Sequence, residues 1–123
     1  MIRANVDPSD KLLRVCYSGH VTAEETRKAA EEVVGLVKDL APGFRLAADL
    51  TDLETMDLDC VPHLNRMMDV CNEAGVSLIV RIIPDPHKDI GMKIMSLFHY
   101  GKRVRIVTAQ TWEEALEVIA KLT

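Results

Sequence analysis

The sequence contains few aromatic residues, which make up 4% of its 123 positions. Because ligand pockets are commonly lined by aromatic side chains, this scarcity disfavours a pocket for a large aromatic ligand. Cysteines are also few: Cys16, Cys60 and Cys71 are odd in number and widely spaced. They therefore predict reduced thiols, which are typical of the cytoplasm, and not a disulfide framework.

A net positive charge and long apolar runs are lacking as well. The net charge of −4 disfavours a nucleic-acid partner, because contacts with phosphates need a concentrated basic surface. No apolar run approaches the roughly 20 residues that span a bilayer, and the first residues, MIRANVDPSD, lack the apolar core of a secretory signal. We expect a cytoplasmic protein with one domain, residues 1–123, that neither binds nucleic acid nor inserts into membranes.

Short motifs of common catalytic and phosphate-binding sites are missing too. The sequence has no Gly-x-Ser-x-Gly turn for a serine nucleophile and no Gly-rich phosphate loop of either common spacing. Cys60 remains a candidate nucleophile, because a helix start favours the thiolate, but the carboxylates of Asp57 and Asp59 oppose it. We therefore expect that the protein is not an enzyme and uses no cofactor.

Strand and helix patterns alternate along the chain. Stripes of apolar residues at spacings of three and four predict four helices, one after each strand from the second onward. Alternation favours parallel pairing with right-handed crossovers, whereas the turn DPSD favours an antiparallel first pair. The expected fold is α/β, with a mixed, mostly parallel sheet and the order β-β-α-β-α-β-α-β-α. The expected strands are 2–6, 12–18, 44–50, 76–83 and 103–109.

Several residues mark the ends of these helices. The segments TAEE and TWEE, beginning at Thr22 and Thr111, are capping boxes in which Thr and Glu satisfy free amide groups. Asp57 or Asp59 is expected to cap the second helix, and Gly75 is expected to end it in a left-handed conformation.

The segment LAADLTDLETMDLDCVPHL, residues 46–64, combines a strand, a run of acids and a helix start. Carboxylate oxygens bind Mg²⁺, but these acids lack the spacing and the glycine of a calcium loop. A phospho-acceptor receiver domain would also end its last strand with a lysine, where this sequence reads TAQ. A solvated loop or a protein-docking surface is favoured over a metal site. The acids are Asp49, Asp52, Glu54, Asp57 and Asp59.

Sulfur and imidazole side chains near this segment offer two weaker alternatives. Cys60 and His63 share a helix face, but a zinc site needs about four ligands, so we expect no metal there and a partly exposed His63. Met67, Met92 and Met95 lie off the strongest apolar stripes. Because methionines also line adaptable binding surfaces, they are candidates for facing a partner protein or a second copy in a homodimer.

The segment RIIPDPHKDIG, residues 81–91, follows an expected inner strand. In open α/β sheets, ligands bind beyond the carboxyl ends of the strands, where this segment and the acid-rich one would meet. The alternative is a connector that its two prolines stiffen. The candidate edge for a partner or ligand comprises Asp57, Leu58, Asp59, Cys60, His63, Asp85, His87 and Lys88.

The element order resembles that of the STAS domain, the fold of bacterial anti-sigma-factor antagonists, in the SpoIIAA-like superfamily. YSGHVTAEET resembles the entry into the family's first long helix. Residues 46–64 resemble its central segment, where a strand ends in Asp-Leu-Ser or Thr and Asp-Ser-Ser-Gly then opens a helix. Residues 49–51 and 57–60 take these two places. The segment VRIIPDPHKDIGMKIMSLFHYGKRVRIV differs from the short antagonists and resembles a stand-alone branch.

One departure from the family pattern concerns its phosphorylation site. In the antagonists a partner kinase phosphorylates the second Ser of Asp-Ser-Ser-Gly, and Asp59 stands at that position here, between Leu58 and Cys60. No phosphosite is therefore expected there. A carboxylate carries one negative charge and a phosphate about −1.5 to −2, so Asp59 would mimic the phosphorylated state only in part.

The resemblance implies a non-enzymatic regulatory or protein-interaction module. Its partner would be an anti-sigma-factor-like kinase or another signalling protein, bound at the edge formed by residues 52–63 and the following helix. The alternative is a small-ligand binding protein, for a lipid or a nucleotide, because relatives of this fold include ligand carriers.

Overall fold

The computed structural model describes residues 1–7, 11–84 and 104–122 of the chain. Within these ranges, no helix is long and apolar enough to cross a membrane. The element order agrees with the prediction, except that the third expected helix, at 90–101, lies outside the described residues. The elements are β1 (Ile2–Asp7), β2 (Leu12–Val21), α1 (Ala23–Val37), β3 (Arg45–Met56), the 3₁₀ helix η1 (Leu58–Cys60), α2 (Val61–Ala74), β4 (Leu78–Ile82), β5 (Arg105–Ala109) and α4 (Trp112–Lys121).

The five described strands form one mixed sheet in the order β1-β2-β3-β4-β5. β1 pairs antiparallel with β2, so that Ile2 lies opposite Tyr17. The remaining pairs are parallel, with β3 at the centre. The predicted α/β class and the mostly parallel sheet are therefore confirmed.

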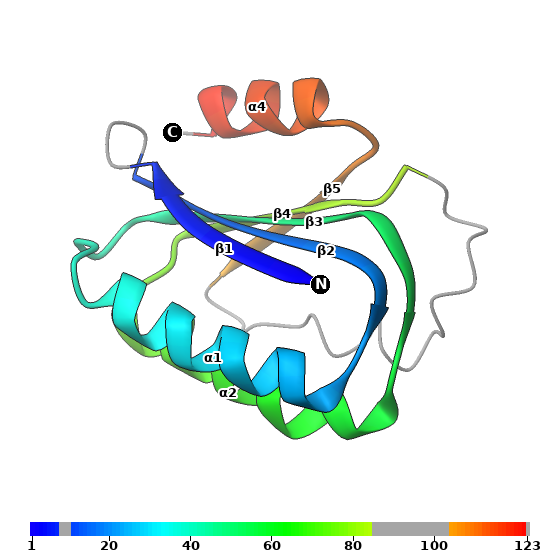
Figure 1. The fold of residues 1–123 in the computed structure, drawn as a ribbon. Helices are drawn as coiled ribbons and strands as arrows, with labels where there is room; N and C mark the ends of the chain where they lie inside the picture. Colours follow the sequence, from blue (N-terminus) through cyan, green and yellow to red (C-terminus); the bar gives the residue numbers. More distant parts are fainter. Residues whose placement is uncertain (8–10, 85–103, 123) are drawn as a thin grey trace.

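Helices cover both faces of the sheet. Figure 1 shows α1 and α2 on one face and α4 on the other. Successive residues of a strand point to opposite faces, so Ile79 of β4 joins the core under α1 and α2, whereas Val80 joins the core under α4. Burial on both faces explains why the sequence of β4 is apolar except for Arg81.

β2 and β3 continue beyond their expected ends. β2 runs past Gly19 to Val21, and β3 runs to Met56. The pairing survives because it shifts register on either side of Gly19, which has the positive φ of 65° that glycine tolerates. The expectation that Asp52 and Glu54 lie in a loop was therefore wrong, since both project from β3 and are exposed.

The two Thr caps were predicted correctly. Thr22 Oγ1 accepts a hydrogen bond from the Glu25 amide at 3.3 Å, and Glu25 Oε1 accepts one from the Thr22 amide at 3.3 Å. Thr111 Oγ1 accepts from the Glu114 amide at 3.1 Å. The Glu114 carboxylate, however, accepts from the amide of Gln110 at 3.0 Å, one residue before the cap.

The start of α2 differs from the expectation. Asp57 makes no side-chain cap hydrogen bond, and Cys60 occupies the N-cap position of α2, so capping by Asp57 or Asp59 was wrong. The cause is η1, in which the Cys60 amide donates to the Asp57 carbonyl at 3.0 Å. Pro62 lies in the first turn of α2, and the expected left-handed Gly75 is present at its end.

Candidate functional site

A short segment, residues 55–60, lies at the carboxyl ends of β2 and β3; we call it the 55–60 tip. Leu58 is 67% exposed, the largest exposed fraction among the large apolar side chains that the structure describes. Asp57 and Asp59, on either side of it, are also exposed. The tip is anchored by its backbone, because the Asp57 amide donates to the carbonyl of Val21 at 3.1 Å.

His20 joins the end of β2 to this tip. Its Nε2 lies 3.1 Å from Asp57 Oδ1, and its Nδ1 shares a hydrogen bond with Thr55 Oγ1. About half of each of these two side chains, His20 and Asp57, is exposed, so their contact adds little stability. His20 was not among the predicted site residues, because its position opposite Thr55 depends on the shifted register between β2 and β3.

Cys60, the last residue of the tip, lies in the core and not on the surface. It is fully buried, and its Sγ donates to the Val21 carbonyl at 3.6 Å. Burial raises the pKa of the Cys60 thiol, which opposes a reactive thiolate. Of the predicted edge, Asp57, Leu58 and Asp59 are thus exposed together, while Cys60 supports them from the core. His63, on α2, is partly exposed, as expected.

Several other predictions of the candidate edge involve the segment after β4. Asp85, His87 and Lys88 lie outside the described residues, so their sharing a rim with the tip stays a prediction. Met92 and Met95 also lie outside them. The placement of Met67 on a partner-facing surface was wrong, because it is 5% exposed and packs in the core between α2 and the sheet.

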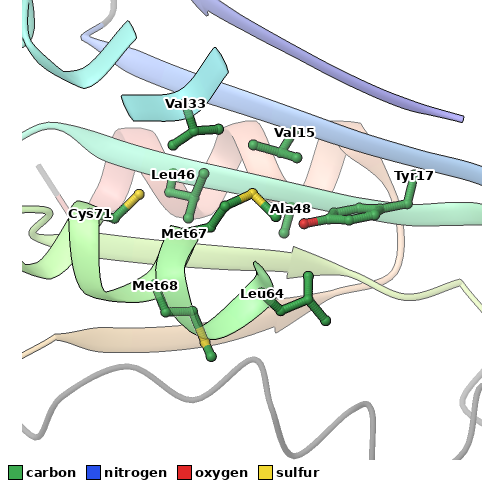
Figure 2. A pocket seen from close by; sticks show the side chains of 9 residues that line it. All are labelled: Val15, Tyr17, Val33, Leu46, Ala48, Leu64, Met67, Met68 and Cys71. Carbon is green, nitrogen blue, oxygen red and sulfur yellow. The ribbon is translucent and has the colours of Figure 1, made fainter. Parts of the chain in front are cut away.

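An apolar cavity lies between the sheet and the two helices α1 and α2 (Figure 2). It leaves about 10 Å³ for the centre of a water molecule, which is room for one water. This volume is far too small for a lipid chain or a nucleotide. The lining residues are Val15, Tyr17, Val33, Leu46, Ala48, Leu64, Met67, Met68 and Cys71.

A second hollow lies at the opposite end of the sheet from the tip. It measures about 370 Å³ and includes Val6, Lys11 and Leu40 in its lining. It does not coincide with the edge predicted for a ligand. Among the residues that the structure describes, no group of three or more His, Cys, Asp or Glu side chains could hold a metal ion.

Comparisons with known proteins agree on the fold. No protein-family model and no curated protein matches the chain. Among solved structures, SpoIIAA of Bacillus in its phosphorylated form is 16% identical, with a TM-score of 0.64 over 97% of this chain and 99% of that one. An anti-sigma factor antagonist from Mycobacterium paratuberculosis is 18% identical, with a TM-score of 0.58 over 98% and 95%.

A third solved structure is an uncharacterised protein from the DUF3478 family with a SpoIIAA-like fold, from Shewanella loihica. It is 12% identical, with a TM-score of 0.67 over 97% of this chain and 92% of that one. These matches span nearly the whole of both chains at low identity. The chain therefore has the SpoIIAA-like fold of STAS domains, as the sequence predicted.

Proposed function

We propose that this protein is a non-enzymatic regulatory module that binds a partner protein through the 55–60 tip. The observation that carries the proposal is Leu58, an apolar side chain 67% exposed on a hydrogen-bonded tip. Interfaces are commonly organised around such an apolar anchor with a polar rim. The carboxylates of Asp57 and Asp59 supply that rim.

The anchoring of the tip supports this role. Binding is weakened when a loop must become ordered, so a tip already held by backbone hydrogen bonds and by His20 loses less entropy. The flanking carboxylates favour a partner that offers an apolar pocket bordered by lysine or arginine. The solved relatives described as anti-sigma factor antagonists suggest an anti-sigma-factor-like protein, or another signalling protein, as that partner.

Asp59 gives the proposed module a fixed charge. The resemblance to the antagonists implies that Asp59 stands in the place of their phosphorylated serine, and Asp59 is exposed. The proposal is that the tip binds its partner without a phosphorylation switch at residue 59. Replacing Asp59 with Ser would then restore a hydroxyl, and phosphorylation by the partner would be a new property of the variant.

The experiment compares partners captured from host lysate by the wild type and by variants, followed by binding measurements with each purified candidate. Leu58→Arg and Asp59→Lys alter the tip. Leu116→Arg changes a side chain 45% exposed on α4, and Glu73→Lys changes an exposed acid on α2, so both are matched controls. We expect one partner whose affinity falls at least about tenfold in the tip variants only.

Equal retention of every captured protein by wild type and Leu58→Arg would contradict the proposal. If the wild type captures no protein from the lysate, that result would also count against the proposal. Native mass spectrometry of the purified protein then decides for or against the alternative function, since an additional retained mass would indicate a bound small ligand.

A further inference from the structure

Arg81 occupies an unusual position on the inner strand β4. Its neighbours along the strand, Ile79 and Ile83, belong to the core under α1 and α2, so Arg81 projects from the same face of the sheet. In the parallel register it lies beside Ala48 of β3 and Thr108 of β5. Apart from Thr108, these neighbours are apolar.

The charge of Arg81 has little compensation. Its Nε is buried without a hydrogen-bond partner, and its Nη2 donates to Thr108 Oγ1 at 3.3 Å, a long distance for such a bond. None of the ion pairs formed by described residues includes Arg81, whereas Arg27 on α1 pairs with both Glu24 and Glu31. Burial lowers the pKa of Arg81, and no carboxylate of the residues that the structure describes offsets this effect.

A guanidinium that has an unsatisfied donor and no neighbouring counter-charge favours the binding of an anion. It carries five N–H donors, and burying it without a counter-charge is unfavourable. Thr108 is exposed and Arg81 is partly exposed, so solvent and solutes reach the hydroxyl and part of the guanidinium, although Nε itself is buried. Because Thr108 Oγ1 accepts the hydrogen bond from Arg81, its own hydrogen is free to be donated.

We propose that Arg81 and Thr108 form a binding site for a small oxyanion, a phosphate or carboxylate group of a solute. The guanidinium would donate two hydrogen bonds to the anion, and the Thr108 hydroxyl a third. Both residues are the second-last of their strands, close to the carboxyl ends where open α/β sheets bind ligands. The apolar neighbours strengthen the attraction by lowering the local screening.

The proposal does not depend on the function of the 55–60 tip. That tip lies at the end of β3, whereas Arg81 and Thr108 lie on β4 and β5. A variant such as Leu58→Arg is therefore expected to bind the anion like the wild type, and failure of either proposal leaves the other testable.

The test uses the whole protein and follows the Arg81 Nε–H signal by NMR during titration with inorganic phosphate or with acetate. Sodium chloride at matched ionic strength is the reference, because it reveals effects of screening alone. We expect a saturable shift with at least one oxyanion, and the two arms distinguish phosphate from carboxylate. Thermal unfolding with the same solutes gives the matching stabilisation.

Variants assign the effect to the site. Arg81→Met should lower the affinity for the anion at least about tenfold, and Thr108→Val should lower this affinity less. Arg105→Met, which removes an exposed guanidinium from the same strand as Thr108, should bind like the wild type. Arg81→Lys keeps the positive charge but loses the planar set of N–H donors of the guanidinium. It should therefore bind the anion more weakly while retaining a native circular dichroism spectrum.

Two results would overturn the proposal. One is a wild-type titration in which phosphate and acetate do no more than sodium chloride. The other is an equal response in wild type and Arg81→Met. If Arg81→Met does not fold, the wild-type titration and Arg81→Lys decide the question, since a guanidinium that is merely solvated shows no saturable response to an oxyanion.

Discussion

The indole N–H of Trp112, in the first turn of α4, donates a hydrogen bond to Asp49 Oδ2 at the centre of the sheet. The other carboxylate oxygen of Asp49 accepts hydrogen bonds from the amide and the hydroxyl of Thr51. The guanidinium carbon of Arg14 lies 5.0 Å from the Trp112 ring centroid. Asp49, Trp112 and Arg14 thereby fasten α4 to β2 and β3.

Removing the Asp49 carboxylate should destabilise the protein substantially. Asp49→Ala leaves the donors of Trp112 and Thr51 without their acceptor, and we expect a loss of about 1–3 kcal/mol in the free energy of unfolding. Trp112→Phe should lose about 1 kcal/mol or more, and the double variant should lose less than the sum because both changes break one contact. Urea unfolding measures all three. Asp52→Ala, at an exposed site on β3, is the control, and strict additivity would refute the coupling.

The helix caps provide a second test. Thr22→Ala and Thr111→Ala should each lower the free energy of unfolding by about 1 kcal/mol, because each leaves a helix amide without its side-chain acceptor. Asp59→Ala should change it by less than about 0.5 kcal/mol, since Asp59 is exposed and does not cap α2. Chemical unfolding decides this, and a loss in Asp59→Ala equal to that in Thr22→Ala would show that Asp59 does act as a cap.

These caps illustrate which features could be predicted from sequence. Thr22 and Thr111 act on amides three residues away, so their role is local and the pattern sufficed. The failure at Asp57 and Asp59 arose from tertiary pairing, because β3 stays paired with β2 as far as Met56 and η1 follows directly. The residue at which β3 ends is set by its register with β2, a strand that is distant in the sequence.

In the candidate site too, features set by the local sequence could be predicted, and features set by tertiary pairing could not. The exposed Leu58 between two acids was visible in the sequence, whereas His20 was not, since 35 residues separate it from its partner Thr55. Met67 was misplaced because the core under α2 is wider than one apolar stripe. Arg81 was predicted to lie in the strand 76–83, but the lack of a partner for its Nε becomes evident only once its neighbours in the sheet are known.

Two glycines should respond in opposite directions to replacement by alanine. Gly75 has a φ of 94°, and a Cβ there would lie 2.9 Å from Pro42 Cβ. Gly75→Ala should therefore destabilise the protein by about 1–3 kcal/mol. Gly35 is exposed in α1, and a Cβ there meets no atom within 4 Å, so Gly35→Ala should stabilise by about 0.5–1 kcal/mol. Paired urea unfolding curves test both signs, and a neutral Gly75→Ala would mean that the α2 end tolerates a different conformation.

The free energy of unfolding should fall in alkaline solution, because the core contains buried thiol and phenol groups. Burial raises the pKa of Cys71 to about 12, and it also raises the pKa values of Cys60 and Tyr17. Above the ordinary thiol pKa of about 8.5, the unfolded chain loses protons that the folded chain keeps, so stability falls as pH rises. Each such group lowers the free energy of unfolding by up to about 1.4 kcal/mol per pH unit in this range.

Urea unfolding between about pH 7 and pH 10.5, which spans the ordinary thiol and phenol pKa values, measures this decline. Cys71→Ala removes one of the groups and should give a shallower slope, although its stability at neutral pH is lower because the change leaves a cavity. Thiol labelling under native conditions adds an independent check, in which the partly exposed Cys16 should react before Cys60 and Cys71. A pH-independent stability, or early labelling of Cys71, would show that this core opens more readily than its packing implies.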